Sequence, residues 1–245
     1  EKGEGIYLTD TNGNVYIDAM SSLWNVNIGH GREELAEVAA EQMKKLAFSS
    51  TFSTFSHKPA ILLAEKIASL APEGLNAVFF TSGGSESNDT AIKLVRHYWR
   101  IQGKPEKRKI IGLGRAYHGV AAASTSATGI PEFWNMAGKM MVDIYHADNP
   151  YGNGKEKAIA SLRAVIEREG PETVAAFIAE PIQGAGGVLI PPKEYLQEVR
   201  AICDEYGILY IADEVITGFG RTGKWFGIEN FGVTPDVISF AKGVT

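Results

Sequence analysis

The sequence has little that could cross-link the chain or anchor it in a membrane. A single cysteine, Cys203, excludes an internal disulfide and a cysteine-rich metal site. Cys203 falls in an amphipathic helical pattern, so we expect a buried structural thiol and not a nucleophile. No apolar run reaches the roughly 18 residues of a membrane span, and no signal peptide is visible. We therefore expect a cytoplasmic protein without a membrane partner.

Positive charge is also scarce. The 24 lysines and arginines are outnumbered by 29 acidic residues, which leaves a net charge of −5 and argues against a nucleic-acid partner. The one basic cluster, residues 104–109 (KPEKRK), lies between a helical and a strand pattern, and we interpret it as a solvated loop. There is no internal repeat, and no metal site is predicted. Because the chain begins at Glu1 without a methionine and stops abruptly at Thr245, we expect a fragment that is truncated at both ends.

A hairpin and helices are predicted near the N-terminus. Residues 5–18 alternate apolar and polar side chains around a turn, which is typical of two antiparallel strands. Residues 32–46 have apolar side chains at helical spacing, and Pro59 can begin a further helix. We assign residues 1–45 to part of a smaller α+β domain and residues 46–245 to a large domain, because the pattern changes there.

Short apolar strands alternate with helices in the rest of the chain. The predicted strands are residues 77–80, 109–113, 174–179, 208–212 and 237–240, and the predicted helices are residues 86–100, 158–168 and 193–206. Strands that are almost entirely apolar and are joined through helices indicate an α/β fold with a mostly parallel sheet, covered by helices on both faces.

Residues whose side chains can bind a ligand or take part in chemistry follow each predicted strand. In open α/β sheets, ligands bind beyond the carboxyl ends of the strands. The residues at these ends are 82–88 (SGGSESN), Tyr117 with His118, Glu180 with Gln183, Asp213, and Lys242. They supply an anion site, an aromatic ring, a carboxylate with an amide, a second carboxylate and an amine. So complete a set predicts a ligand site at this edge of the sheet.

The segment 82–88 has the features of a phosphate site. Gly83 and Gly84 permit a tight turn, and the backbone N–H groups at the start of the following helix carry partial positive charge. The Ser85 hydroxyl can add a hydrogen bond. Taken alone, the segment is equally compatible with a plain capped helix after a glycine turn.

Two other motifs point to nucleotide binding but are incomplete. Residues 218–223 fit G-x-G-x-x-G, yet neither a helical pattern nor an acidic residue at the required distance follows. Residues 208–214 (ILYIADE) resemble the apolar strand and acidic pair of an NTPase, but the partner motif G-x-x-x-x-G-K-[ST] is absent from the sequence. We reject both interpretations.

A larger pattern resembles the class III pyridoxal-phosphate-dependent aminotransferases, in particular the omega-transaminases. It consists of residues 213–223 (DEVITGFGRTG), Asp236, and Lys242 within 241–243 (AKG). With residues 82–88 and 117–119 (YHG), the match extends over most of the chain. The resemblance implies fold type I, pyridoxal 5'-phosphate as cofactor, and a homodimer with shared active sites.

The resemblance also implies residue roles. Lys242 would bind the cofactor covalently, and Asp213 would pair with the pyridine nitrogen. Gly83, Gly84 and Ser85 would hold the phosphate, Tyr117 and Val215 would contact the ring faces, Gln183 would approach the ring 3′ oxygen, and Glu180 would brace the polar network. A lysine attacks a carbonyl only when deprotonated, so the site must lower its pKa. A buried carboxylate keeps the pyridine nitrogen protonated.

The substrate prediction depends on Trp24. It lies in residues 21–25 (SSLWN), where many amine- and ω-amino-acid-specific members of the family place a pocket tryptophan, although plain core packing is an alternative. We predict amino-group transfer from an amine or ω-amino acid to a 2-oxo acid such as pyruvate. Alternatives that stay open are a diaminopelargonate-, ornithine- or GABA-type aminotransferase, an aminomutase or decarboxylase with the same site, and a non-catalytic cofactor-binding module.

Overall fold

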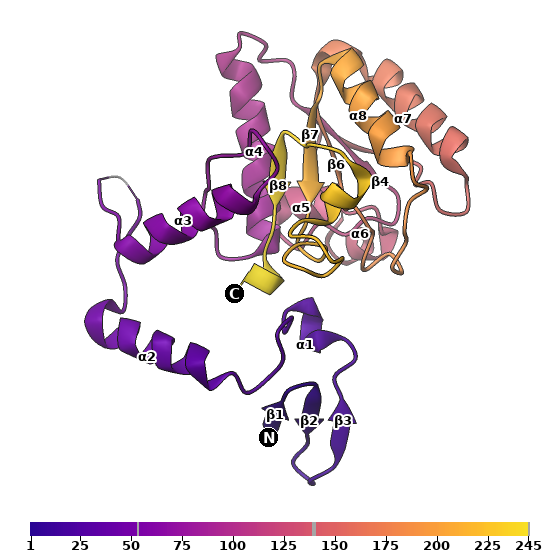
Figure 1. The fold of residues 1–245 in the computed structure, drawn as a ribbon. Helices are drawn as coiled ribbons and strands as arrows, with labels where there is room; N and C mark the ends of the chain where they lie inside the picture. Colours follow the sequence, from indigo (N-terminus) through magenta and orange to yellow (C-terminus); the bar gives the residue numbers. More distant parts are fainter. Residues whose placement is uncertain (53, 139–140, 245) are drawn as a thin grey trace. The chain divides into compact units, whose positions relative to one another are not determined.

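The computed structural model describes residues 1–52, 54–138 and 141–244, which form two compact units, Glu1–Phe79 and Phe80–Thr245 (Figure 1). Among these residues, no helix combines the length and apolar character that crossing a bilayer requires. The domain boundary predicted after residue 45 stays a prediction.

The N-terminal unit begins with a small antiparallel sheet. Its strands β1 (Lys2–Glu4), β2 (Tyr7–Thr9) and β3 (Val15–Ile17) pair in sequence order, which confirms the predicted hairpin. Asp10 stabilises the turn between β2 and β3, because its Oδ1 accepts the backbone N–H groups of Asn12 (2.8 Å) and Asn14 (2.9 Å).

Three helices follow in this unit. The short segment α1 (Ser21–Trp24) contains non-helical dihedral angles, whereas α2 (Glu33–Leu46) and α3 (Lys58–Leu70) are regular and agree with the predicted helices. Pro59 lies in the first turn of α3, where its missing N–H costs no intrahelical bond. The apolar side chains of α2 remain exposed in this structure.

The C-terminal unit is built on a five-stranded parallel sheet. The strands are β4 (Lys109–Leu113), β5 (Ile144–Ala147), β6 (Val174–Ala179), β7 (Leu209–Asp213) and β8 (Val237–Ser239), in the spatial order β5-β4-β6-β7-β8. Every neighbouring pair is parallel, and all residues of the central strand β6 are buried. Both findings confirm the predicted α/β architecture.

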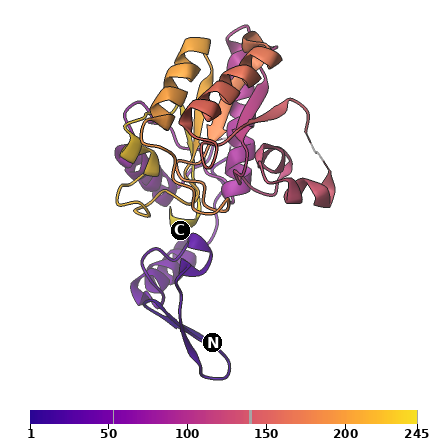
Figure 2. The ribbon, with the colours of Figure 1, turned by 90° about the vertical axis from the view of Figure 1, so that its right-hand side faces the viewer.

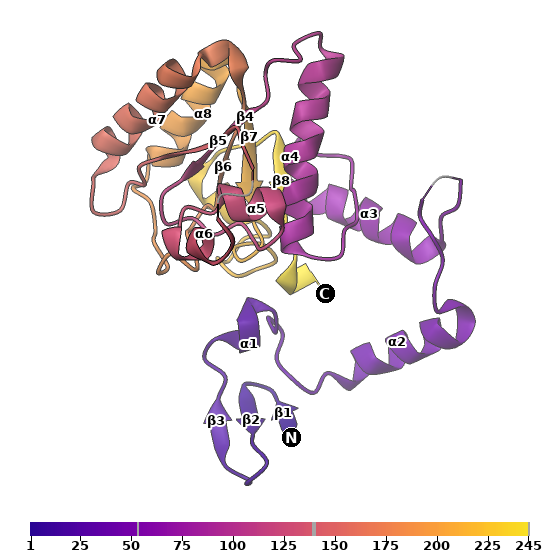
Figure 3. The same ribbon diagram turned by 180° about the vertical axis from the view of Figure 1, so that it is seen from behind.

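Helices cover both faces of this sheet. α4 (Gly84–Ile101) and α5 (Ala122–Ala127) lie on one face, and α7 (Lys155–Glu169) and α8 (Tyr195–Tyr206) lie on the other (Figures 1 and 3). Figure 2 shows α7 and α8 side by side. The remaining short helices, α6 (Pro131–Ala137) and the 3₁₀ segments Pro171–Thr173, Gly227–Phe231 and Lys242–Val244, lie in the connections.

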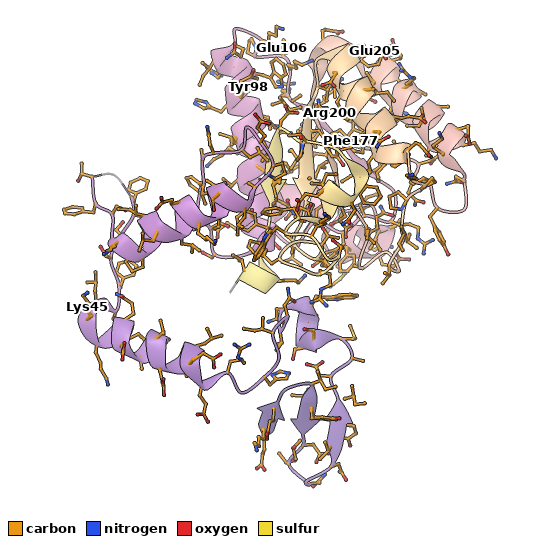
Figure 4. All side chains as sticks on the ribbon, viewed as in Figure 1. Lys45, Tyr98, Glu106, Phe177, Arg200 and Glu205 are labelled. Carbon is orange, nitrogen blue, oxygen red and sulfur yellow. The ribbon has the colours of Figure 1, made fainter. Side chains whose placement is uncertain are left out.

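The core of this unit is divided between the two faces. On the α4 side, Ile92 and Val95 pack against Ile110 and Ile178 of the sheet. Towards α8, Phe177 and Tyr210 have ring centroids 5.6 Å apart, and the Arg200 guanidinium carbon lies 5.9 Å from the centroid of the Tyr210 ring. Phe177 and Arg200 are labelled in Figure 4. This double packing holds the strand ends, and therefore the residues after them, in a fixed arrangement.

One predicted strand is wrong, and two strands, Lys2–Glu4 and Ile144–Ala147, were missed. Residues 77–80 form no strand and pair with no other strand in the described part of the chain; Phe79 is 76% exposed. An apolar run becomes a strand only where a neighbour supplies hydrogen-bonding partners, and none does so here. Ile144–Ala147 instead forms the edge strand β5, although its sequence (IYHA) is short and includes a polar residue.

The basic cluster is only partly solvated, which corrects our interpretation of residues 104–109. Lys107 is 5% exposed, its ammonium group donates a hydrogen bond to the Pro171 carbonyl (3.2 Å), and its Nζ lies 4.8 Å from the centroid of the Trp99 ring. Lys104 and Arg108 remain exposed.

Cys203 is buried on α8, where burial raises the pKa of its thiol to about 12, and the predicted structural thiol is confirmed.

Candidate functional site

A cleft of about 200 Å³ opens at the carboxyl ends of the strands in the C-terminal unit. Its lining comes from the start of α4 and from the segments that follow β4, β6, β7 and β8. The lining residues are Gly84, Ser85, Tyr117, His118, Gly119, Glu180, Asp213, Val215, Ile216, Ala241 and Lys242. The structure therefore brings most of the predicted site residues together at the edge that the strand order indicated.

The start of α4 forms one wall of the cleft. Gly83 precedes the helix in an extended conformation, and a Cβ on Gly84 would lie only 2.9 Å from both Val215 methyl carbons. The Ser85 hydroxyl accepts a hydrogen bond from the Val120 N–H (3.0 Å). Because the first N–H groups of a helix have no intrahelical acceptor, this end of α4 presents partial positive charge to the cleft.

Asp213 ends β7 and is 3% exposed. Its Oδ2 accepts hydrogen bonds from Nδ2 of Asn88 (2.8 Å) and lies 2.7 Å from Nδ1 of His118. Its Oδ1 accepts the Val215 N–H (3.1 Å). Three contacts from three different segments hold this carboxylate in one orientation at the cleft.

Lys242 follows β8 and is half-buried in the same cleft. Burial lowers the pKa of the Lys242 ammonium, and the negative charges of Asp213 and Glu180 oppose that change. The residue has a φ of 54°, which is costly for a side chain other than glycine and is typical of functional positions. The lowered pKa increases the fraction of neutral amine, the nucleophilic form.

Glu180 joins the loops after β4 and β6. Its Oε1 accepts the Tyr117 N–H (2.9 Å), and its Oε2 accepts the Gly184 N–H (2.8 Å). Burial raises the pKa of Glu180 to about 7, and the nearby Asp213 charge adds to the effect. The Tyr117 ring packs against Phe133, with ring centroids 5.3 Å apart. Glu180 thus positions the backbone of Tyr117, the predicted ring contact.

Three predicted residues, Gly83, Gln183 and Trp24, are not part of the cleft lining. Gln183 is buried beside it, and its side-chain amide donates to the Gly114 carbonyl (3.0 Å). Trp24 belongs to the N-terminal unit, where it is partly exposed with a φ of 65°. The roles of these three residues stay predictions.

The sequence argument placed Asn88 within the segment 82–88 but gave it no role of its own, and it missed the function of Glu214. Asn88 lies one helical turn after Gly84 and Ser85, so helical spacing from these two residues was the available signal. The fully buried Glu214 carboxylate accepts the N–H groups of Gly227 (2.8 Å) and Ile228 (2.7 Å). It therefore organises the loop 218–226, which forms turns and opens no α-helix, in agreement with the rejected dinucleotide motif.

Known proteins are similar to this chain in sequence and in fold. The family model described as aminotransferase class-III matches residues 1–245. The chain belongs to the class-III aminotransferase family. It is 47% identical to a putrescine–pyruvate aminotransferase of Pseudomonas aeruginosa and 45% identical to an omega-amino acid–pyruvate aminotransferase of Pseudomonas putida, covering 56% of each relative and 100% and 99% of this chain.

A solved transaminase structure has the same fold as this chain. The crystal structure of a transaminase from the marine bacterium Virgibacillus superposes with a TM-score of 0.98 at 72% identity, over 99% of this chain and 55% of that one. This class-III aminotransferase chain therefore spans about half the length of the relatives it matches.

Proposed function

We propose that the protein is a pyridoxal-phosphate-dependent aminotransferase that moves an amino group from a primary amine or ω-amino acid to a 2-oxo acid such as pyruvate. One observation carries the proposal. The Lys242 amine, the buried Asp213 carboxylate and the start of α4 line the same cleft. They complement the three recognition groups of pyridoxal phosphate, which are its aldehyde, its ring nitrogen and its phosphate.

The residues around the cleft fit this cofactor. Lys242 would hold the aldehyde carbon, Asp213 the protonated ring nitrogen, and Gly83, Gly84 and Ser85 the phosphate. The missing side chain at Gly84 leaves space that a Cβ would take from Val215. Tyr117 and Val215, which both line the cleft, would contact the ring. When bound, the cofactor supplies an electron sink for the charge that develops on the donor carbon.

The chain's own groups perform the proton transfers. After the donor amine has replaced Lys242 at the aldehyde carbon, the freed and neutral Nζ of Lys242 would take a proton from the donor carbon and, as a general acid, return it to the cofactor carbon. Burial lowers the pKa of the Lys242 ammonium, which increases the share of the neutral amine that this role requires. In the net reaction the donor amine becomes an aldehyde or ketone and the 2-oxo acid becomes an amino acid, so no external oxidant is needed.

Two lines of support favour amines and ω-amino acids as donors. The relatives named above act on putrescine or ω-amino acids with pyruvate. Trp24 would add an apolar wall for a donor's carbon chain. The family resemblance also leads us to propose a homodimer with shared active sites, which sedimentation of the purified protein can test.

Covalent attachment at Lys242 is the decisive test. Wild type and Lys242→Ala are incubated with pyridoxal phosphate, reduced with borohydride and analysed by intact and peptide mass. We expect one reduced cofactor on the Lys242 peptide of wild type and none on the variant. Equal labelling of the variant would refute the assignment. A panel of putrescine, β-alanine and α-amino acids with pyruvate then tests the donor class.

A further inference from the structure

We propose that Asn88 is a positioning residue for Asp213, an inference that rests on the proposed function. In this proposal the Asp213 carboxylate faces the ring nitrogen of the cofactor. The side-chain amide of Asn88 attaches this carboxylate to α4, the helix that begins at the phosphate site. Nδ2 of Asn88 donates to Asp213 Oδ2 (2.8 Å) and to the His118 carbonyl (2.7 Å). Asn88 is fully buried.

The orientation of the Asn88 amide follows from its partners. Both are acceptors, so the NH₂ group must face them, and a flipped amide would place its oxygen against a carboxylate and a carbonyl. Among the described residues, Asn88 Oδ1 is buried and has no hydrogen-bond partner. An unpaired buried acceptor is costly, and this cost is tolerated because the two donor bonds determine the orientation.

The second bond of the amide reaches the backbone of His118, a residue whose side chain also contacts Asp213. By holding the His118 carbonyl, Asn88 also restrains the residue whose ring nitrogen Nδ1 lies 2.7 Å from the same Asp213 oxygen. A neutral amide achieves this without placing a further charge beside the carboxylate. Removing Asn88 would therefore loosen Asp213 directly and through His118.

Asn88 and the residues of the phosphate site lie on the same helix, α4. Gly84 and Ser85 lie at the cleft, and Asn88 is four residues after Gly84, a rise of about 6 Å along the helix axis. One rigid helix thus presents the anion-binding end and also holds the carboxylate for the ring nitrogen. We infer that α4 keeps a constant distance between the phosphate site and the Asp213 carboxylate.

A binding experiment with two ligands separates this role from a general effect on folding. The first ligand is pyridoxamine phosphate, which has the ring nitrogen but forms no bond to Lys242. The second is its carbocyclic analogue, in which carbon replaces the ring nitrogen. Asn88→Ala should weaken pyridoxamine phosphate binding about tenfold or more, the effect of losing a hydrogen bond to a charged group. Binding of the analogue should change by less than about threefold, because it does not use Asp213.

A spectroscopic readout and a matched variant complete the test. The ¹⁵N chemical shift of ring-labelled pyridoxamine phosphate reports protonation of the ring nitrogen, and we expect it to move towards the neutral form in Asn88→Ala. Arg96→Ala is the control, because it removes another α4 hydrogen bond, from Arg96 Nε to the Arg108 carbonyl (2.9 Å), that does not involve Asp213. We expect Arg96→Ala to leave the affinity and the shift at their wild-type values.

The outcomes distinguish the inference from the proposed function. If wild type does not bind pyridoxamine phosphate, the proposed function and this inference both fall. If wild type binds but Asn88→Ala weakens both ligands equally, or neither, or leaves the ¹⁵N shift unchanged, only the positioning role is overturned.

Discussion

Gly84 and Val215 approach each other so closely that a Cβ on Gly84 would lie 2.9 Å from both methyl carbons of Val215. Gly84 is the first residue of α4, and Val215 follows β7 by two residues. The close approach brings the helix start beside Asp213, which ends the same strand. The close approach, and not the backbone conformation, requires glycine here, because the φ of Gly84 is not positive.

This contact predicts the effect of Gly84→Ala. The added methyl group should overpack the site and reduce the free energy of unfolding by about 1–3 kcal/mol. Val215→Ala removes both clashing methyl carbons. Adding Gly84→Ala to the Val215→Ala variant should therefore cost much less unfolding free energy than adding it to wild type. Urea unfolding of the four proteins gives the coupling energy, and additive effects would contradict the steric explanation.

Glu180 predicts a specific pH dependence of stability. Its pKa is raised from 4.5 to about 7, so between these values the folded protein keeps a proton that the unfolded chain releases. The contribution to stability is therefore present below about pH 4.5 and is lost as the pH rises towards 7, with a slope of at most about 1.4 kcal/mol per pH unit. Glu180→Gln cannot titrate and should lack this decline.

The measurement is the unfolding free energy of wild type and Glu180→Gln at several pH values from 4.5 to 8. Substitution of the exposed Glu41 by glutamine is the matched control and should reproduce the wild-type profile. Parallel curves for wild type and Glu180→Gln would show that Glu180 does not carry a proton in this range.

Lys107 and Lys104 allow a comparison of buried and exposed cations on one ring. Their ammonium groups lie 4.8 and 5.3 Å from the centroid of the Trp99 ring, but only Lys107 is buried. Lys107→Ala loses apolar packing, the ring contact and the bond to the Pro171 carbonyl, and should cost about 1–2 kcal/mol. Lys104→Ala should cost at most about 0.5 kcal/mol. Equal losses in thermal unfolding would show that burial is not the deciding factor.

Trp24 predicts donor preference. Trp24→Ala should reduce kcat/KM for amine and ω-amino acid donors by more than tenfold, about 1.4 kcal/mol of lost transition-state stabilisation. The dissociation constant of pyridoxal phosphate should stay near its wild-type value. A donor panel at constant pyruvate concentration tests this prediction. A preference for α-amino acids that the variant retains would disprove the donor assignment and leave the aminotransferase proposal standing.

The α/β architecture and the end of the sheet at which the site lies follow from the amino-acid sequence alone. Buried parallel strands are apolar throughout, and the residues that follow them collect at one end of the sheet. Asp213, Glu180 and Lys242 could therefore be assigned to one cleft from their positions after strands. Buried Cys203 was also predictable, because its environment depends on the periodicity of a single helix.

Features that depend on residues far apart in the sequence required the folded structure. Residues 77–80 are apolar enough for a strand but meet no neighbour in the sheet, whereas Ile144–Ala147 becomes a strand because β4 pairs with it. Lys107 is buried because Trp99 and the Pro171 carbonyl happen to surround it. Asn88 and Asp213 lie 125 positions apart in the sequence, and no local pattern reveals that one orients the other. Hydrophobic periodicity is a property of neighbours along the chain, but a hydrogen bond requires the folded geometry that brings remote segments together.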